Sequence, residues 1–173
     1  MKKFVGGLLL LLSITGCSLT EPLPIKGEVV SCDSIITKSM SGELLECLDG
    51  SQGVAVDAIT GPALLNVWGT WCAPCRQELP HFAHFLGKHK DVQIIGIAVE
   101  EKNSATVKKF VETHGMTWPI LVDSKNSTRG KFGMGVPVTW FIDETGAVTY
   151  KKYGPFKSLE EIELDVARHL GVK

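Results

Sequence analysis

The chain has 173 residues, of which 18 are basic and 19 acidic, giving a formal net charge of -1. This length is typical of one domain with its own hydrophobic core, and the near balance of charges gives no reason to expect a nucleic acid as a partner. The five cysteines are an odd number, so one thiol of an exported protein would lack a partner within the chain.

The first 17 residues predict export and a lipid anchor. A basic start precedes an apolar run over 4–12, which is shorter than the ~20 apolar residues that span a bilayer and fits the core of a secretory signal. The sequence ITGC, which ends at Cys17, resembles the cleavage box of bacterial lipoproteins. This resemblance implies a signal peptide over 1–16, a lipid on Cys17 and a tether over 17–27. An ordinary signal peptide or an N-terminal anchor helix is the alternative.

Hydrophobic patterns after this leader predict alternating strands and helices. Apolar or β-branched runs of strand length lie at 28–32, 43–48, 63–68, 92–99 and 119–123. Helices are predicted over 73–89, from Asn103 or Ser104 to Gly115, near 127–132, and after the capping box at Ser158. A β-hairpin is predicted for 138–143 and 147–152. This order predicts an α/β fold with a central sheet and, from the first two runs, an N-terminal β-hairpin extension.

Two cysteines, Cys72 and Cys75, stand at the predicted junction between a buried strand and a helix, in the sequence WGTWCAPC. Unpaired N–H groups and the dipole at a helix N-terminus stabilise a thiolate, which is the nucleophile in disulfide exchange. The second cysteine is close enough to resolve a mixed disulfide. Half of a zinc site fits less well, because zinc needs four ligands. A purely structural bridge fits less well too, because so short a loop gives little entropic stabilisation.

Three separated stretches of this chain resemble the thioredoxin superfamily. They are NVW at 66–68, WCAPCRQELP at 71–80 and GVPVTWFID at 135–143. The resemblance covers about residues 50–170 and points to the extracytoplasmic thiol-disulfide oxidoreductases of the TlpA/ResA/CcmG (DsbE) type. It implies a thioredoxin-like fold, with a central mixed β-sheet flanked by helices, in a domain over 28–173.

The same resemblance assigns roles to individual residues. It implies that Cys72 is the attacking thiol and Cys75 the resolving thiol. Pro137 matches the family's cis-proline, which faces the active site, and Val136 would offer backbone groups to an extended substrate. Apart from the resemblance, Trp68 and Trp71 would shield the disulfide and offer apolar contact to partners. A trans proline at a strand start, and a tryptophan that only packs, are the alternatives.

An acidic residue near the two cysteines is expected from the resemblance. Thioredoxin has a buried aspartate six residues before its first cysteine, where this chain has Asn66, which cannot carry a proton at ordinary pH. The TlpA/ResA/CcmG branch has an acid three residues after the second cysteine, and Glu78 occupies that position. Glu78 lies one helical turn beyond Cys75, so we hypothesise that it tunes the thiols or accepts the proton of Cys75 through water. An exposed glutamate, favoured by the helix dipole, is the alternative.

Cys32 and Cys47 have only each other as partners once Cys17 carries a lipid and the other two cysteines pair. An exported compartment favours such a structural disulfide, and a second, regulatory redox pair is the alternative. Three histidines on the predicted helix at 73–89 could suggest copper, but a solvated helix face explains them better; they are His81, His84 and His89.

The sequence therefore predicts an enzyme, a lipid-anchored extracytoplasmic thiol-disulfide oxidoreductase. Its expected partners are exported proteins with thiols or disulfides, apocytochrome c among them, a membrane redox partner, and the bilayer through acylated Cys17. No organic cofactor and no metal is implied. Relatives that reduce apocytochrome c favour a reductase, whereas other exported relatives oxidise client proteins. A redox-silent lipoprotein that binds or delivers a metal is an alternative of another class. A peroxidase fits poorly, because Thr70 lies only two residues before Cys72 and the peroxiredoxin pattern is Thr-x-x-Cys.

Overall fold

A computed structural model describes residues 26–39 and 42–172 of the protein. The predicted signal peptide, the cleavage box with Cys17, and the tether up to residue 25 lie outside these residues. Within the described part of the chain, no helix is both long enough and apolar enough to cross a membrane.

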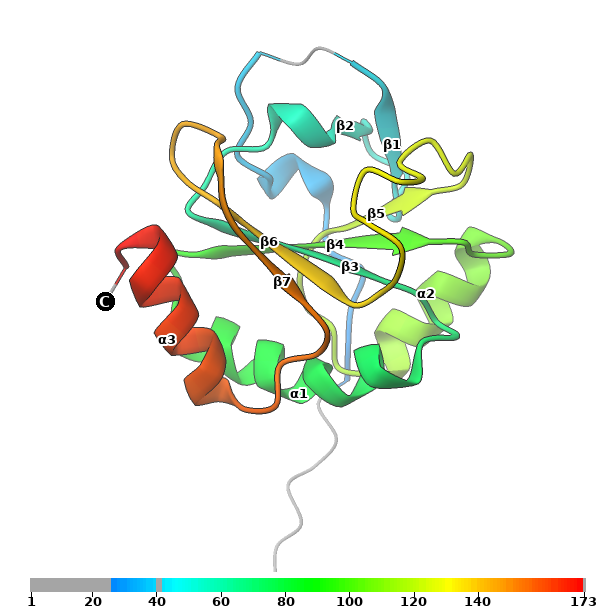
Figure 1. Cartoon of the computed structure of the whole chain (residues 1–173). Coiled ribbons are helices and arrows are strands. Elements are labelled where there is room, and N and C mark those ends of the chain that lie inside the picture. Colours follow the sequence, from blue (N-terminus) through cyan, green and yellow to red (C-terminus); the bar gives the residue numbers. More distant parts are fainter. Residues whose placement is uncertain (1–25, 40–41, 173) are drawn as a thin grey trace, which may run out of the picture.

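One mixed sheet of seven strands forms the centre of the domain, in the order β2-β1-β5-β4-β3-β6-β7 (Figure 1). The strands are β1 (Leu44–Cys47), β2 (Val54–Ala55), β3 (Ala63–Trp68), β4 (Gln93–Val99), β5 (Ile120–Asp123), β6 (Val138–Ile142) and β7 (Val148–Tyr153). β3 is central, and it pairs in parallel with β4 and antiparallel with β6. The predicted central mixed sheet is therefore confirmed, as is the hairpin of β6 and β7.

Three α-helices pack on one face of this sheet (Figure 1). They are α1 (Ala73–Lys88), α2 (Ser104–Thr113) and α3 (Leu159–Leu170). α1 and α2 are the crossovers that the parallel strands β3, β4 and β5 require. The predicted N-caps are confirmed, because the side chain of Asn103 accepts a hydrogen bond from the Thr106 amide at 2.8 Å and that of Ser158 accepts one from the Glu161 amide at 3.1 Å.

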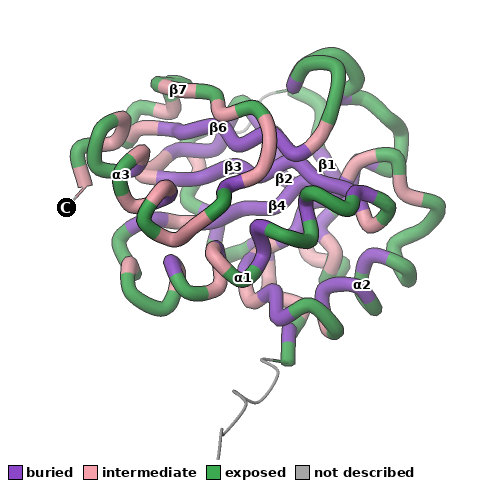
Figure 2. Tube along the Cα trace, turned by 60° about the horizontal axis from the view of Figure 1, so that its bottom comes forward, coloured by how far each residue is buried: buried purple, intermediate pink, exposed green. Residues whose placement is uncertain are grey.

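The central strand β3 is buried on both faces (Figure 2). Its side chains alternate between the faces, so Leu64 and Trp68 pack toward the α-helices while Leu65 and Val67 pack on the opposite side. That second core is closed by the short 3-10 helices η1 (Cys32–Ser34) and η2 (Val56–Ala58) and by loop residues. A strand buried on both faces explains the unbroken apolar run that predicted it.

The strand predicted over 28–32 is wrong. This segment forms a single bridge, between Val30 and Pro119, and then enters η1. The start of the segment instead bonds to the end of α2 and the turn beyond it, since Gly27, just before it, donates to the Glu112 carbonyl at 3.1 Å and Glu28 donates to the Met116 carbonyl at 3.0 Å. A Cβ on Gly27 would clash with the Val111 carbonyl, so this close approach requires glycine. The hairpin near the N-terminus is formed by β1 and β2, and β2 was not predicted.

The helical segment predicted near 127–132 is also wrong, because these residues form consecutive turns. The carboxylate of Asp123 accepts hydrogen bonds from the backbone amides of Ser127 and Thr128 at 2.8 and 2.9 Å. Gly130 then takes a φ of +81°, which ends any helical path. A carboxylate that binds nearby backbone amides offers the chain an alternative to a helix, and here it prevails.

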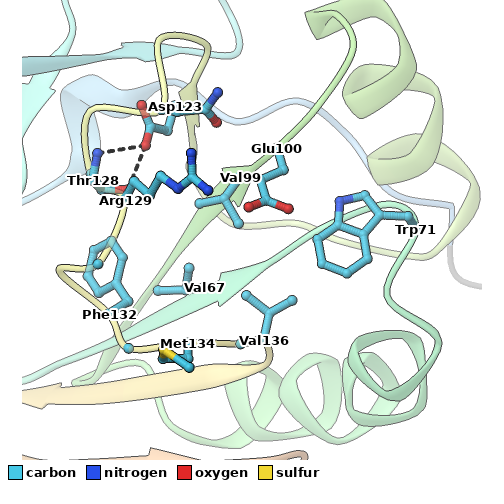
Figure 3. A pocket seen from close by; sticks show the side chains of 14 residues that line it. Val67, Trp71, Val99, Glu100, Asp123, Thr128, Arg129, Phe132, Met134 and Val136 are labelled. Carbon is cyan, nitrogen blue, oxygen red and sulfur yellow. Dashed lines mark hydrogen bonds between the residues drawn. The ribbon is translucent and has the colours of Figure 1, made fainter.

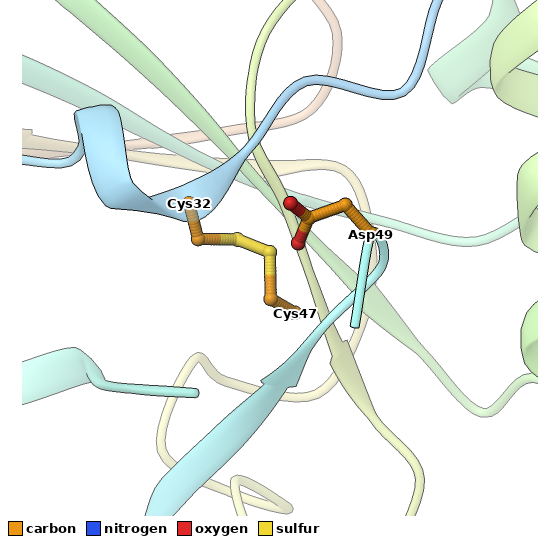
Figure 4. Close-up of side chains that lie close together, drawn as sticks. All are labelled: Cys32, Cys47 and Asp49. Atoms are coloured by element: carbon orange, nitrogen blue, oxygen red, sulfur yellow. A yellow bond between two sulfur atoms is a disulfide. The ribbon is translucent and has the colours of Figure 1, made fainter. Parts of the chain in front are cut away.

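Cys32 and Cys47 form a disulfide with Cα atoms 6.0 Å apart (Figure 4). Both side chains are buried, and the bond joins the N-terminal segment to β1. The carboxylate of Asp49 lies beside the bridge, and these three residues are the only cluster of three candidate metal ligands among the described residues. Two of the three ligand atoms are sulfurs bonded to each other, so the cluster does not offer two thiolates to a metal ion.

We expect the Cys32–Cys47 bond to stabilise the domain without taking part in exchange. Replacing both residues by alanine should lower the free energy of unfolding by about 3 kcal/mol in the chain-entropy model for a loop of this length. Denaturant unfolding under non-reducing conditions measures this loss. Mass spectrometry after mild reduction is the control, and opening of this bridge together with Cys72–Cys75 would contradict a structural role.

Candidate active site

The end of β3 and the start of α1 bring Cys72 and Cys75 together in a disulfide, with Cα atoms 5.3 Å apart. Cys72 is the N-cap of α1, and its Sγ accepts a hydrogen bond from the backbone amide of Cys75 at 3.1 Å. When the disulfide is reduced, this amide and the helix dipole favour a thiolate on Cys72. The predicted placement at a strand-to-helix junction is therefore confirmed.

The loop before Cys72 is held by a carboxylate that the sequence analysis missed. Glu101 accepts hydrogen bonds from both the backbone amide and the hydroxyl of Thr70, the latter at 2.8 Å. Arg76 donates to the Thr70 carbonyl at 3.2 Å. A signal was available, because Glu101 follows β4, and the carboxyl ends of the parallel strands β3 and β4 meet at one edge of the sheet.

The segment before β6 lies against the disulfide. The Val136–Pro137 peptide bond is cis, as the resemblance implied. The carbonyl oxygen of Val136 lies 3.8 Å from Sγ of Cys72. Residues 64 positions apart meet here because β6 pairs with β3, with Val67 opposite Val138. Pro137 is buried and Val136 is half-buried, so a backbone carbonyl is presented next to the sulfur of Cys72.

Glu78 is fully buried, so the alternative of an exposed surface glutamate is wrong. Its Oε1 accepts a hydrogen bond from Nδ2 of Asn66 at 2.9 Å, and its Oε2 accepts one from the backbone amide of Phe156 at 3.1 Å. Burial raises the pKa of Glu78 to about 7, although these two hydrogen bonds and the charge of Lys152 act in the opposite direction. A carboxyl group with this pKa changes its charge near neutral pH.

A cavity of about 510 Å³ is lined by Trp71, the residue before Cys72, and by Val136, whose carbonyl lies next to Sγ of Cys72 (Figure 3). Its wall includes Phe132 and Met134 from the turns before β6, and the charged side chains of Glu100 and Arg129 also line it. Trp71 is 54% exposed and Met134 fully exposed, so apolar surface is available next to the disulfide. Trp71 and Val136 were predicted from the sequence. Arg129 and Phe132 were not, because they fell in the helix predicted near 127–132, and Met134 carried no sequence signal.

The histidines of α1 do not form a common site in the described part of the chain, where no histidine belongs to a cluster of three candidate ligands. Nε2 of His89 lies 3.2 Å from the Glu163 carboxylate on α3. His84 is exposed and His81 is half-buried, in keeping with a helix face at the surface.

Comparison with known proteins agrees with this geometry. The chain matches the AhpC/TSA family over residues 42–151. It is 32% identical over 153 residues to the thioredoxin-like protein YneN of Bacillus subtilis, a match that covers 86% of this chain and 88% of YneN. It is 35% identical over 119 residues to the thiol-disulfide oxidoreductase ResA of Bacillus anthracis, covering 67% and 68% of the two chains. The solved structure of a thiol:disulfide interchange protein of the thioredoxin family from Chlorobium tepidum gives a TM-score of 0.62 at 25% identity. The match covers 79% of this chain and 98% of that one.

We expect the buried carboxyl of Glu78 to make the fold less stable as the pH rises. Its pKa is about 7 in the fold against an ordinary value of 4.5, so between these values the folded protein binds more protons than the unfolded chain, and its stability falls with rising pH. Glu78→Gln cannot ionise. From pH 4.5 to about 7 its free energy of unfolding should therefore rise, relative to that of the unchanged protein, by about 3 kcal/mol.

Denaturant unfolding of both proteins in the disulfide form, at a series of pH values, measures this difference. The comparison cancels the titration of every other group. A difference that stays constant from pH 4.5 to 8 would show that Glu78 keeps its ordinary pKa.

Proposed function

The chain belongs to the AhpC/TSA family and is a thioredoxin-like thiol-disulfide oxidoreductase of the TlpA/ResA/CcmG class, and on this premise we propose that it reduces disulfides of exported proteins through Cys72 and Cys75. The observation that carries the proposal is the Cys72–Cys75 disulfide at the N-terminus of α1, beside the carbonyl of Val136. The exposed apolar surface of Trp71 and Met134 supports contact with a protein substrate at this point.

In the proposed reaction, the Cys72 thiolate attacks one sulfur of the client disulfide. A mixed disulfide forms between Cys72 and that sulfur, and the other client sulfur leaves as a thiolate and takes up a proton. The Cys75 thiol then loses its proton and attacks Sγ of Cys72. The client leaves with two thiols, having gained two electrons, and the Cys72–Cys75 disulfide is restored.

Glu78 is the proposed acceptor for the proton of Cys75. It lies one helical turn from Cys75 on α1, and both residues are buried. Burial opposes an ionised thiol as well as an ionised carboxylate, so Cys75 needs a nearby base at the moment it attacks. A carboxyl group with a pKa of about 7 supplies one at neutral pH without holding a permanent charge.

The segment around Pro137 is proposed to position the polypeptide chain of the client protein. The backbone carbonyl of Val136 lies 3.8 Å from Sγ of Cys72, where the backbone of this residue can pair with an extended client segment. Trp71 adds apolar contact from the other side of the cavity.

We also propose that the protein works outside the cytoplasm and is held at the membrane by a lipid on Cys17. The support is the sequence of the leader and its cleavage box. A structural disulfide between Cys32 and Cys47 agrees with an oxidising compartment. The domain would then meet a membrane redox partner at high effective concentration, and apocytochrome c is the proposed client class.

Variants of the two cysteines test the roles assigned to them. Cys75→Ser should accumulate a mixed disulfide with an oxidised substrate such as insulin, because the resolving thiol is absent. Cys72→Ser should form none and should lose insulin reduction. Non-reducing electrophoresis and mass spectrometry detect the adduct.

The matched control replaces Cys32 and Cys47 together, which removes the other disulfide and should leave exchange intact. Retained insulin reduction by Cys72→Ser would contradict the proposal. So would stoichiometric copper or zinc binding through Cys72 and Cys75 by a protein without exchange activity, which would indicate a metal-delivery module.

The reduction potential of the Cys72–Cys75 couple tests the direction. A reductase should have a potential near that of thioredoxin, about -270 mV, whereas a value near -120 mV would make the protein an oxidant of its clients. Equilibration with glutathione or dithiothreitol buffers, followed by alkylation and mass spectrometry, measures it. The Cys32/Cys47 double variant isolates the couple from the second disulfide.

A further inference from the structure

One polar side chain, that of Asn66, interrupts the apolar strand β3. Asn66 is fully buried and lies on the face of β3 that packs against α1, since Leu64 and Trp68 on either side of it belong to the core that contains Cys75. A central strand buried on both faces is normally apolar throughout, so the amide at this position needs an explanation.

The amide of Asn66 makes two hydrogen bonds and leaves one atom without a partner. Nδ2 donates to Oε1 of Glu78 at 2.9 Å and to Oγ1 of Thr139 at 3.2 Å. Oδ1 is buried and has no hydrogen-bond partner among the described residues. A buried polar atom without a partner is destabilising, so Asn66 is a poor choice for stability alone.

We propose that Asn66 is a positioning residue for the redox site, and that its amide holds Oε1 of Glu78 in the orientation in which the carboxyl group exchanges a proton with Cys75. The inference rests on the proposed role of Glu78 as the proton acceptor. It extends that role to a residue on another element of the fold, since Asn66 touches neither the disulfide nor a client and acts through Glu78.

The groups around Glu78 show why this amide controls its charge. Among the residues that the structure describes, Asn66 on β3 and the Phe156 amide before α3 are the two hydrogen-bond donors to the carboxyl group. A donor to a carboxylate favours its charged form. Lys152 on β7 also favours the charged form, and Glu161 on α3 disfavours it. Lys152 is already paired with Glu161, with Nζ 2.7 Å from Oε1, so much of its charge is offset. Of these two donors to Glu78, only that of Asn66 belongs to a side chain.

The test is the titration of the Glu78 carboxyl group, followed by ¹³C NMR of the full chain in detergent with the Cys72–Cys75 disulfide intact. In Asn66→Ala, loss of the hydrogen bond should raise the pH midpoint by about one unit. In the dithiol form, the pH at which the exchange rate is half-maximal should rise with it. Thr139→Val is the matched control, because it removes the other partner of the same amide and leaves the bond to Glu78, and its shift should be smaller.

Two further variants keep the inference testable if Asn66→Ala folds poorly. Asn66→Asp has nearly the same shape and places a second carboxyl group against Glu78, so the pair should share a proton and its upper midpoint should rise further. In a Glu78→Gln background, Asn66→Ala should leave the pH profile of exchange unchanged.

An unchanged Glu78 midpoint in both Asn66→Ala and Asn66→Asp would overturn the inference. So would a shift of the exchange profile by Asn66→Ala that persists in the Glu78→Gln background, because Asn66 would then act independently of Glu78. The titration in the disulfide form needs no exchange activity. Its failure is therefore distinct from failure of the proposed function, which the Cys72 and Cys75 variants report.

Discussion

The site depends on the position at which β3 leaves the sheet. β3 is hydrogen-bonded on both sides and buried on both faces, so its last residue, Trp68, has little freedom. Cys72 follows four residues later as the N-cap of α1. The same pairing places the end of β4 and the start of β6 at this edge of the sheet. Glu101, which follows β4, and Pro137, which precedes β6, therefore lie near the disulfide although they are far from it in the sequence.

Much of the fold could be predicted from the sequence where the pattern of each element is strong and local. The apolar run of β3, the caps of α2 and α3, and the turn between β6 and β7 each depend on residues close in sequence. The errors at 28–32 and 127–132 have a different origin. The first segment contains two valines, but the amides of Gly27 and Glu28 at its start bond to the end of α2 and the turn beyond it. In the second segment, the Asp123 carboxylate binds the backbone amides of Ser127 and Thr128. In both segments, competing hydrogen bonds determine the backbone conformation. Secondary-structure propensities of single residues do not include such bonds.

The candidate active site likewise has some features that the sequence predicts and others that depend on the fold. The cysteine pair at a strand-to-helix junction is a local pattern, and Pro137 and Glu78 followed from the resemblance. The contacts of Thr70 with Glu101 and of Glu78 with Asn66 and Phe156 depend on strand order and on the return of α3 across the sheet. Helical spacing placed Glu78 beside Cys75, but it could not show that the loop before α3 buries the carboxyl group. Burial is what moves its pKa into the range where it can act.

Burial also couples reduction of the disulfide to the uptake of protons. Reduction of Cys72–Cys75 adds two electrons in a region where Cys75 and Glu78 share one face of α1 and exclude water. Two negative charges this close in a low dielectric are costly, so ionisation of one of these two groups opposes ionisation of the other. Cys72 is different, because the Cys75 amide and the helix N-terminus stabilise its charge. This asymmetry supports the separate tasks proposed for the two sulfurs of one disulfide, attack for Cys72 and proton-dependent resolution for Cys75.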